Sequence, residues 1–274
     1  MKQAAGSTPH PFSCPVAMTI AGSDSGGGAG IQADLKAFAS MGVFGTSAIT
    51  CITAQNPSEV RGVLSVDPGM VRLQAETICD GFQVAAVKTG MLYSADIIRE
   101  VAGVAADRNL APLVVDPVMV ATSGAKLLRD DAIDALRDEL LPMATVLTPN
   151  LPEAEILCGR SVGSPAEIER SAREIAERFG VACVVKGGHL GAGELGDTVL
   201  DVLCIDGEIS TFEGPRVDTT ETHGTGCMFS AAMAASLAGS DSVRDAVRNA
   251  KDYVRSVLAS LARRSPGEGG TLGS

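Results

Sequence analysis

Short apolar runs rich in Val, Ile and Ala alternate with segments of helical spacing along most of this chain. Such strand–helix alternation predicts a mostly parallel sheet whose two faces are covered by helices. The expected strands are residues 16–21, 43–53, 84–88, 113–116, 145–147 and 181–186, with an antiparallel pair at 197–205 and 208–212. The expected helices are residues 31–40, 68–82, 94–108, 130–141, 152–157, 164–179, 225–237 and 241–261.

The composition suits one folded domain. The 274 residues are 45% hydrophobic, which is enough to bury a substantial core without disulfides. We expect a single domain at residues 16–264, between a flexible lead at 1–15 and a flexible tail at 265–274. The lead has no apolar segment typical of a signal peptide, and no run reaches the length of a transmembrane helix.

Charge and cysteine content argue against several classes of protein. A net charge of −11 and an aromatic content of 3% disfavour a nucleic-acid partner and an anionic membrane surface. The seven cysteines are odd in number and contain no C-x-x-C pair, so we expect neither a disulfide framework nor a zinc site. This usage is typical of a reducing compartment and predicts a cytoplasmic location.

Polar and glycine residues follow most of the expected strands. They are Gly22-Ser23-Asp24, Gln55-Asn56, Lys88-Thr89-Gly90, Asp116, Asn150 and Lys186-Gly187-Gly188-His189. Because ligands of open α/β sheets bind beyond the carboxyl ends of the strands, we expect these residues to share one site.

The segment from Gly224 to Cys227 precedes a run of strong helix formers. The first N–H groups of a helix lack intrahelical partners and carry the positive end of the helix dipole, so this loop is suited to an anion. The same field is expected to favour the thiolate of Cys227, which would then accept a proton. The alternative is a turn made by two glycines, followed by a small core cysteine.

Four further residues suit nucleotide phosphates and a divalent cation, and each has an alternative role. Asp116 would help to hold Mg²⁺ or cap a turn. Asn150 and Glu153 lie three residues apart, which fits either a magnesium and phosphate network or a helix cap with a first-turn acid. Lys186 would reach a phosphate across two glycines or remain a surface lysine.

Two other motifs suggest further kinds of site. The cluster from Gly22 to Gly30 does not fit G-x-G-x-x-G, because Ile31 stands where the third glycine should be. We therefore expect it to close over a small substrate rather than bind a dinucleotide. His223 lies four residues before Cys227, so a Cys–His nucleophile pair of a hydrolase is a further hypothesis, although no third orienting residue is evident.

Seven segments together resemble the hydroxymethylpyrimidine/phosphomethylpyrimidine kinases of the ribokinase superfamily. They are residues 21–34, 53–56, 87–92, 116–119, 148–153, 186–189 and 223–227, within a match that runs from Met18 to Leu261. The resemblance implies a ribokinase-like three-layer α/β/α fold with a mostly parallel central sheet flanked by helices. It also implies ATP- and Mg²⁺-dependent phosphorylation of 4-amino-5-hydroxymethyl-2-methylpyrimidine, and of its monophosphate to the diphosphate, in thiamine biosynthesis.

The resemblance assigns roles to individual residues. Cys227 would accept or guide the hydroxymethyl proton, and Gln55 would hydrogen-bond the pyrimidine edge, where its amide can donate and accept at once. The implied catalytic residues are Cys227, Gly224, Thr225, Gly226 and Lys186. The implied substrate-binding residues are Gln55, Gly22, Asp34, Met91 and Val118. The implied ATP and phosphate ligands are Lys186, Asn150, Gly224 and Gly226, and the implied metal ligands are Asp116 and Glu153.

One departure and several alternatives accompany this resemblance. Met228 follows the cysteine, where the family usually has a small hydroxyl residue that would cap the helix or touch phosphate. A pyridoxal or pyridoxine kinase of the same superfamily and a non-catalytic vitamer-binding protein are the alternatives. By resemblance we also expect a homodimer and no fused second enzyme, while three glycines in residues 191–197 would permit a moving lid.

Overall fold

The computed structural model describes residues 13–56, 58–119, 128, 130–188, 197–219 and 222–264. Most of the expected N-terminal lead, the C-terminal tail, His189 and residues 191–196 of the expected lid lie outside these residues. The expected single domain therefore stays a prediction.

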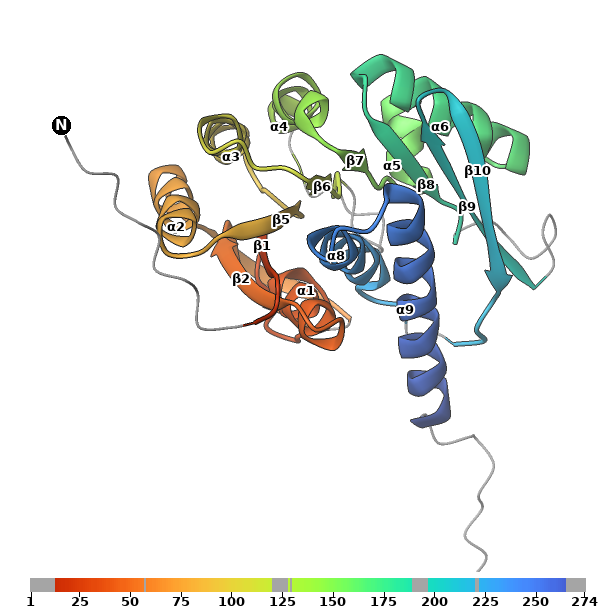
Figure 1. Ribbon diagram of the computed structural model, residues 1–274, viewed down its shortest axis with the longest axis horizontal. Coiled ribbons are helices and arrows are strands. Elements are labelled where there is room, and N and C mark those ends of the chain that lie inside the picture. The colour runs from red at the N-terminus through yellow and green to blue at the C-terminus, as the bar shows by residue number, and fades with distance from the viewer. Residues whose placement is uncertain are drawn as a thin grey trace, which may run out of the picture.

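An eight-stranded sheet lies at the centre of the described part (Figure 1), in the order β10-β9-β8-β7-β6-β5-β1-β2. Its strands are β1 (Val16–Ala21), β2 (Phe44–Ile49), β5 (Val84–Thr89), β6 (Leu113–Val115), β7 (Val146–Leu147), β8 (Ala182–Lys186), β9 (Thr198–Ile205) and β10 (Glu208–Pro215). The pairings from β2 through β8 are parallel, and β9 pairs antiparallel with both β8 and β10. The expected mostly parallel sheet with a terminal antiparallel pair is confirmed.

Helices cover both faces of this sheet (Figure 1). One layer contains α1 (Gly30–Ser40), α8 (Thr225–Ala238) and α9 (Val243–Arg264). The other contains α2 (Pro68–Gly81), α3 (Ala95–Asp107), α4 (Asp130–Ala135) with its continuation at 136–143, α5 (Leu151–Cys158) and α6 (Pro165–Phe179). Successive residues of a strand point to opposite faces, so Ala17 packs in the first layer while Met18 packs in the second. The chain therefore has two cores, one on each side of the sheet.

The expected strand at residues 43–53 is divided in the structure. After β2 the chain turns at Thr50, whose hydroxyl donates to the carbonyl of Met91 at 2.7 Å, and continues as β3 (Cys51–Gln55) outside the main sheet. β3 pairs antiparallel with β4 (Val60–Ser65), a strand that the sequence analysis missed. All six residues of β4 are exposed, so burial leaves no alternating pattern in its sequence.

The helix signals agree better with the structure. The helix expected at residues 94–108 is α3, which Ser94 caps by accepting from the backbone N–H of Ile97 at 3.4 Å. Within the described residues, no helix combines the length and the apolar composition that crossing a membrane requires.

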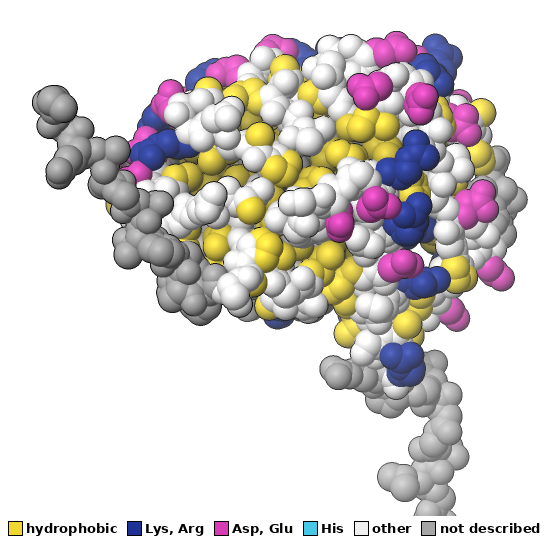
Figure 2. Space-filling model, in the orientation of Figure 1, with side chains coloured by type: hydrophobic (Ala, Val, Ile, Leu, Met, Phe, Trp, Pro, Cys, Tyr) yellow, Lys and Arg dark blue, Asp and Glu magenta, His cyan; other side chains and the backbone are white. Residues whose placement is uncertain are grey.

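Figure 2 shows basic side chains with acidic ones beside them along α9, where Arg248 pairs with Asp245 and Arg255 pairs with Asp252.

Candidate active site

The carboxyl ends of β6, β7 and β8 bring Asp116 and Lys186 together. The Lys186 ammonium donates to Asp116 Oδ1 at 2.9 Å, and Thr148 donates to the same oxygen at 3.2 Å. Asp116 is 3% exposed, and the Lys186 side chain is 11% exposed. Burial by itself would lower the pKa of Lys186, but the charges of Asp116 and Glu153 raise it. The lysine is therefore a fixed cation at the edge of the sheet rather than a mobile surface residue.

The N-terminus of α8 lies beside this cation. Gly224 is the N-cap residue with φ +79°, and a Cβ built on Gly226 would lie 3.3 Å from the Lys186 ammonium nitrogen. Thr225 donates through both its backbone N–H and its hydroxyl to the carbonyl of Thr222. The glycine loop that precedes α1 packs against this turn, because a Cβ on Gly224 would come within 1.9 Å of the Gly28 carbonyl oxygen.

Cys227 corrects one expectation. We expected the helix N-terminus to favour its thiolate, but burial raises the pKa of the Cys227 thiol to about 11, against the opposing effect of Lys88. Nearby Asp34 and Asp116 raise it further. Desolvation and two negative charges therefore outweigh the field of the helix, and the thiol is neutral at physiological pH.

Asp34 lies beneath the site rather than on its surface. Both Asp34 and Lys88 are fully buried, and the Lys88 ammonium donates to the two carboxylate oxygens at 3.0 and 2.8 Å. Thr19 donates to Asp34 Oδ2 at 2.6 Å. Burial would lower the pKa of Lys88, but the Asp34 charge raises it, so the two form an ion pair. In this arrangement no part of Asp34 is open to a ligand.

Asn150 and Glu153 form the capping box of α5. The Glu153 carboxylate accepts from the backbone N–H of Asn150 at 2.9 Å, and Asn150 Oδ1 accepts from the N–H of Glu153 at 2.9 Å. The helix-cap interpretation is thereby confirmed. Burial raises the pKa of Glu153 to about 7, with Lys186 opposing the shift and Asp116 adding to it. Glu153 and Asp116 are therefore close enough to repel each other.

The remaining expected substrate residues lie at the end of β3 or follow β1, β5 and β6 along the chain. Gly22 donates its N–H to the carbonyl of Met91 at 3.1 Å, and a Cβ on Gly22 would approach the Met91 methyl group at 3.4 Å and the Cys51 sulfur at 2.6 Å. Gln55 is half-buried at the end of β3. Val118 is half-buried two residues after Asp116.

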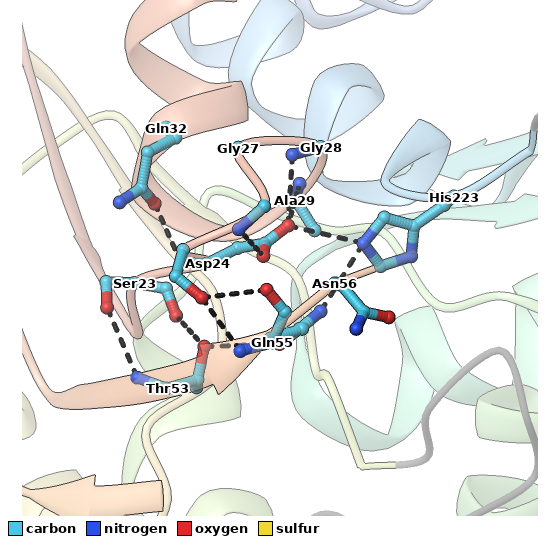
Figure 3. Close-up of polar contacts among 12 residues, drawn as sticks. Ser23, Asp24, Gly27, Gly28, Ala29, Gln32, Thr53, Gln55, Asn56 and His223 are labelled. Carbon is cyan, nitrogen blue, oxygen red and sulfur yellow. Dashed lines mark hydrogen bonds and ion pairs between the residues drawn. The ribbon is translucent and has the colours of Figure 1, made fainter. Parts of the chain in front are cut away.

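Asp24 is a central residue of the site. It was expected there as one of the polar residues that follow the strands, but no individual role was assigned to it. Its carboxylate accepts from the backbone N–H groups of Gly26, Gly28 and Ala29 at 2.8–3.0 Å, and it lies 3.3 Å from His223 Nε2 (Figure 3). An Asp two residues before a glycine is a turn signal that could have found the loop contacts. His223 directs Nε2 toward Asp24 and Gln55, and the neutral thiol of Cys227 lacks the activation that the Cys–His hypothesis requires.

Comparison with known proteins identifies the family. A sequence model described as phosphomethylpyrimidine kinase matches residues 24–271. The chain belongs to the phosphomethylpyrimidine kinase family. It is 44% identical over 255 residues to hydroxymethylpyrimidine/phosphomethylpyrimidine kinase of Haemophilus influenzae, covering 93% of this chain and 94% of that protein.

Solved structures agree with this family and with the expected three-layer fold. Phosphomethylpyrimidine kinase from Clostridium difficile 630 superposes with a TM-score of 0.79 at 36% identity, covering 89% of this chain and 99% of that one. An ADP complex of Bacillus subtilis pyridoxal kinase superposes with a TM-score of 0.80 at 40% identity, covering 88% of this chain and 90% of that one.

In this member of the phosphomethylpyrimidine kinase family, α9 supports the turn after Lys186. Lys251 of α9 donates to Asp201 Oδ2 at 2.6 Å, and Asp201 Oδ1 accepts from the backbone N–H of Gly187 at 3.0 Å. A Cβ on Gly187 would come within 2.0 Å of the Leu200 carbonyl, so the turn has no room for a side chain. Met228, the departure noted in the sequence, donates its N–H to the carbonyl of Gly224 at 2.9 Å.

Proposed function

We propose that this chain transfers the γ-phosphoryl group of ATP to 4-amino-5-hydroxymethyl-2-methylpyrimidine, and then phosphorylates the monophosphate to the diphosphate, in thiamine biosynthesis. The observation that carries the proposal is the position of the Lys186 ammonium at the N-terminal turn of α8, next to Gly226 and Cys227. Family membership supports the same reaction. Phosphoryl transfer needs positioning and charge neutralisation more than covalent chemistry, and this turn supplies both.

Residues of α8 and β8 would bind the phosphates of ATP. The N–H groups of the first turn of α8 have no partner within the helix and would bind phosphate oxygens at Gly224 and Gly226. Lys186 would neutralise charge that moves toward the leaving phosphate. Asn150 lies beside Lys186 through a parallel bridge, which supports its role near the phosphates.

A magnesium ion fits the acidic pair Asp116 and Glu153. Mg²⁺ is usually held by one or two carboxylates together with substrate phosphates and water, so two carboxylates suffice. Burial raises the pKa of Glu153, and the charge of Asp116 adds to the shift. A cation between the two carboxylates would relieve their mutual repulsion. When bound with ATP, the ion would neutralise charge on the phosphates.

Gln55 and Cys227 would contact the pyrimidine that accepts the phosphoryl group. Gln55 would hydrogen-bond the aminopyrimidine edge, with Gly22, Met91 and Val118 lining the ring. Asp34 would act from beneath the site through Lys88. Since the Cys227 thiol is neutral, its sulfur would accept a hydrogen bond from the hydroxymethyl O–H and orient that oxygen toward the γ-phosphorus. The hydroxyl proton would leave late, to an oxygen of the transferred phosphoryl group, while the γ-phosphorus–oxygen bond to ADP breaks.

The test is a coupled ADP-release assay of the purified protein with ATP and Mg²⁺. We expect turnover of hydroxymethylpyrimidine and of its monophosphate. One observation favours pyridoxal as a second substrate: the close similarity to a pyridoxal kinase structure reported above. Turnover of pyridoxal without either pyrimidine would overturn the proposal in favour of that alternative.

Replacing Lys186 with methionine should lower kcat/KM for ATP by about 10²- to 10³-fold, because one fixed charge on the phosphates is lost. The substitution also leaves Asp116 without its 2.9 Å partner. Lys186→Arg retains the charge and is the matched control, for which we expect a smaller loss. Steady-state kinetics with ATP as the varied substrate measure both, and equal activity of the methionine variant and the wild type would contradict the role.

We further propose that the chain is a cytoplasmic homodimer that associates through the outward face of β3 and β4. Ile52 and Leu64 are cross-strand partners on this face and are 52% and 67% exposed. A two-fold contact brings the same surface of both subunits together, so this apolar face would meet its own copy. The seven free cysteines suit a reducing compartment.

Replacing Leu64 with glutamate should convert the dimer to a monomer, because it would bury two like charges at the two-fold contact. Ile156 is an exposed apolar residue on α5, at 42% exposure, and Ile156→Glu is the matched control. Sedimentation velocity of the two variants and the wild type measures the mass. A Leu64 variant that remains dimeric would exclude this face.

A further inference from the structure

The glycine loop before α1 is built around one carboxylate. Asp24 is 2% exposed and accepts hydrogen bonds from Gly26, Gly28 and Ala29. Burial by itself would raise the pKa of Asp24, but the backbone donors, led by Ala29, and His223 lower it below its ordinary value. Asp24 is therefore an anion, and a group that faces its remaining surface must be a donor.

That group is the imidazole of His223. Its Nε2 atom lies 3.3 Å from Asp24 Oδ2 and 3.4 Å from the side-chain nitrogen of Gln55, as Figure 3 shows. An unprotonated Nε2 would present a lone pair to a carboxylate oxygen, whereas a protonated one would donate to it. Asp24 therefore selects the form of His223 that carries a proton on Nε2.

A protonated Nε2 restricts the Gln55 amide. The amide has two orientations, related by a half-turn that exchanges its oxygen and nitrogen. The single Nε2 hydrogen faces both Asp24 and the near end of the amide, so that end can only accept a share of it in a three-centre bond. The oxygen therefore belongs toward His223 and the nitrogen at the other end.

The residue at the other end agrees. In the structure that end is Gln55 Oε1, which lies 3.4 Å from Thr53 Oγ1, while the single hydrogen of the Thr53 hydroxyl is donated at the shorter distance of 2.8 Å to the carbonyl of Ser23. With that hydrogen committed to Ser23, Thr53 Oγ1 is left as an acceptor, which the amide nitrogen would satisfy better than the amide oxygen. Both neighbours therefore favour the half-turned amide, with oxygen toward His223 and nitrogen toward Thr53.

We infer that Asp24 and His223 are positioning residues that fix the orientation of the Gln55 amide. They thereby set the order in which Gln55 presents its donor and acceptor, and so select the heterocycle edge that the site accepts. The inference rests on the proposed function, in which Gln55 contacts the aminopyrimidine. A primary amide offers one donor and one acceptor side by side, and the half-turn exchanges their order. With the order fixed, a ring whose donor and acceptor lie in the opposite order leaves buried polar groups unpaired and is rejected.

The test compares His223→Phe, which keeps an aromatic ring but removes the donor, with His223→Gln, which retains an N–H donor. For His223→Phe we expect a rise of about five- to tenfold in KM for hydroxymethylpyrimidine, the loss of roughly one hydrogen bond, with KM for ATP unchanged. His223→Gln should recover part of this loss. An unchanged pyrimidine KM in His223→Phe would overturn the inference.

A double-mutant cycle separates positioning from a structural role. A Cβ on Gly28 would lie 2.8 Å from His223 Cδ2, so the imidazole also packs on the glycine loop. If His223 acts through Gln55, His223→Phe adds nothing to the KM of Gln55→Ala. If it only supports the loop, the two effects multiply, and the inference fails.

A spectroscopic readout tests the inference even if the pyrimidine is not the substrate. The chain has three histidines, and the His223 signals are assigned by their loss in His223→Phe. Long-range nitrogen–proton NMR spectra of the imidazoles at neutral pH should show a proton on Nε2 of His223. A proton on Nδ1 alone would overturn the inference, whereas failure of the wild type to phosphorylate any pyrimidine would overturn only the proposed function.

Discussion

Replacing Cys227 with alanine should lower kcat for hydroxymethylpyrimidine by about 10²-fold, the order of effect expected when the group that orients the reacting hydroxyl is lost. Both KM values should change little, because the thiol acts on the reacting hydroxyl and the phosphates are bound by backbone groups and Lys186. The ADP-release assay with each substrate varied in turn gives the two parameters.

The pH dependence of kcat distinguishes a thiol from a thiolate. The pKa of Cys227 is raised to about 11, so the thiolate is a minor species at neutral pH and its population rises about tenfold per pH unit. If the neutral thiol orients the hydroxyl, kcat stays level between about pH 8 and pH 9.5, above the pKa of Glu153 and well below that of Cys227. A tenfold rise per pH unit in this range would instead identify the thiolate as the base.

A second cysteine provides the control. Cys79 is half-buried on α2, and burial raises its pKa as well. Cys79→Ala should keep kcat near the wild-type value, because Cys79 lies in the opposite helix layer from α8. If both alanine variants lose activity equally, the effect of Cys227→Ala reports on folding rather than on orientation of the hydroxyl.

Local sequence signals predicted the fold well where they coincided with burial. The run at Val16–Ala21 is buried at every residue, and the predicted bounds match β1. β4 was missed because its residues face solvent and show neither an apolar run nor alternation. The break at Thr50 depends on a contact with Met91, which lies 41 residues away along the chain. Tertiary contacts of this kind leave no local pattern.

The same contrast between local sequence signals and tertiary contacts holds for the site residues. Lys186 and Asp116 were chosen from strand ends, and the structure joins them at 2.9 Å. The protonation state of Cys227 was predicted with the wrong sign, because it depends on burial and on the carboxylates of Asp34 and Asp116, which come from two separate segments. The partner that matters for Asp24, His223, lies 199 residues away. A single sequence therefore indicates which residues reach the site, but not the charges that they carry there.

Replacing Gly224 with alanine should disable both halves of the site at once. The residue has φ +79°, which costs an L-residue about 1–2 kcal/mol. The new Cβ would also meet the Gly28 carbonyl oxygen at 1.9 Å and the Gly28 carbonyl carbon at 2.8 Å. Because these atoms are backbone, the glycine loop and the N-terminus of α8 must separate.

The expected loss of unfolding free energy is about 2–5 kcal/mol, the sum of the left-handed conformation and the overpacking. We also expect kcat/KM to fall by at least about 10²-fold for ATP and for the pyrimidine, since the phosphate-binding turn and the loop around Asp24 move together. Denaturant unfolding and steady-state kinetics measure the two effects.

Gly207 provides a matched control for this substitution. It lies in the turn between β9 and β10 with the same φ of +79°, and a Cβ there would have no atom within 4 Å. Gly207→Ala therefore carries the conformational cost without the collision, and should lose about 1–2 kcal/mol of stability while keeping its activity. If Gly224→Ala matches it in both measurements, the glycine loop and α8 are not in rigid contact. A much larger loss of unfolding free energy and of kcat/KM in Gly224→Ala than in Gly207→Ala would establish that the close approach of the glycine loop and α8 fixes the phosphate-binding and pyrimidine-binding residues relative to each other.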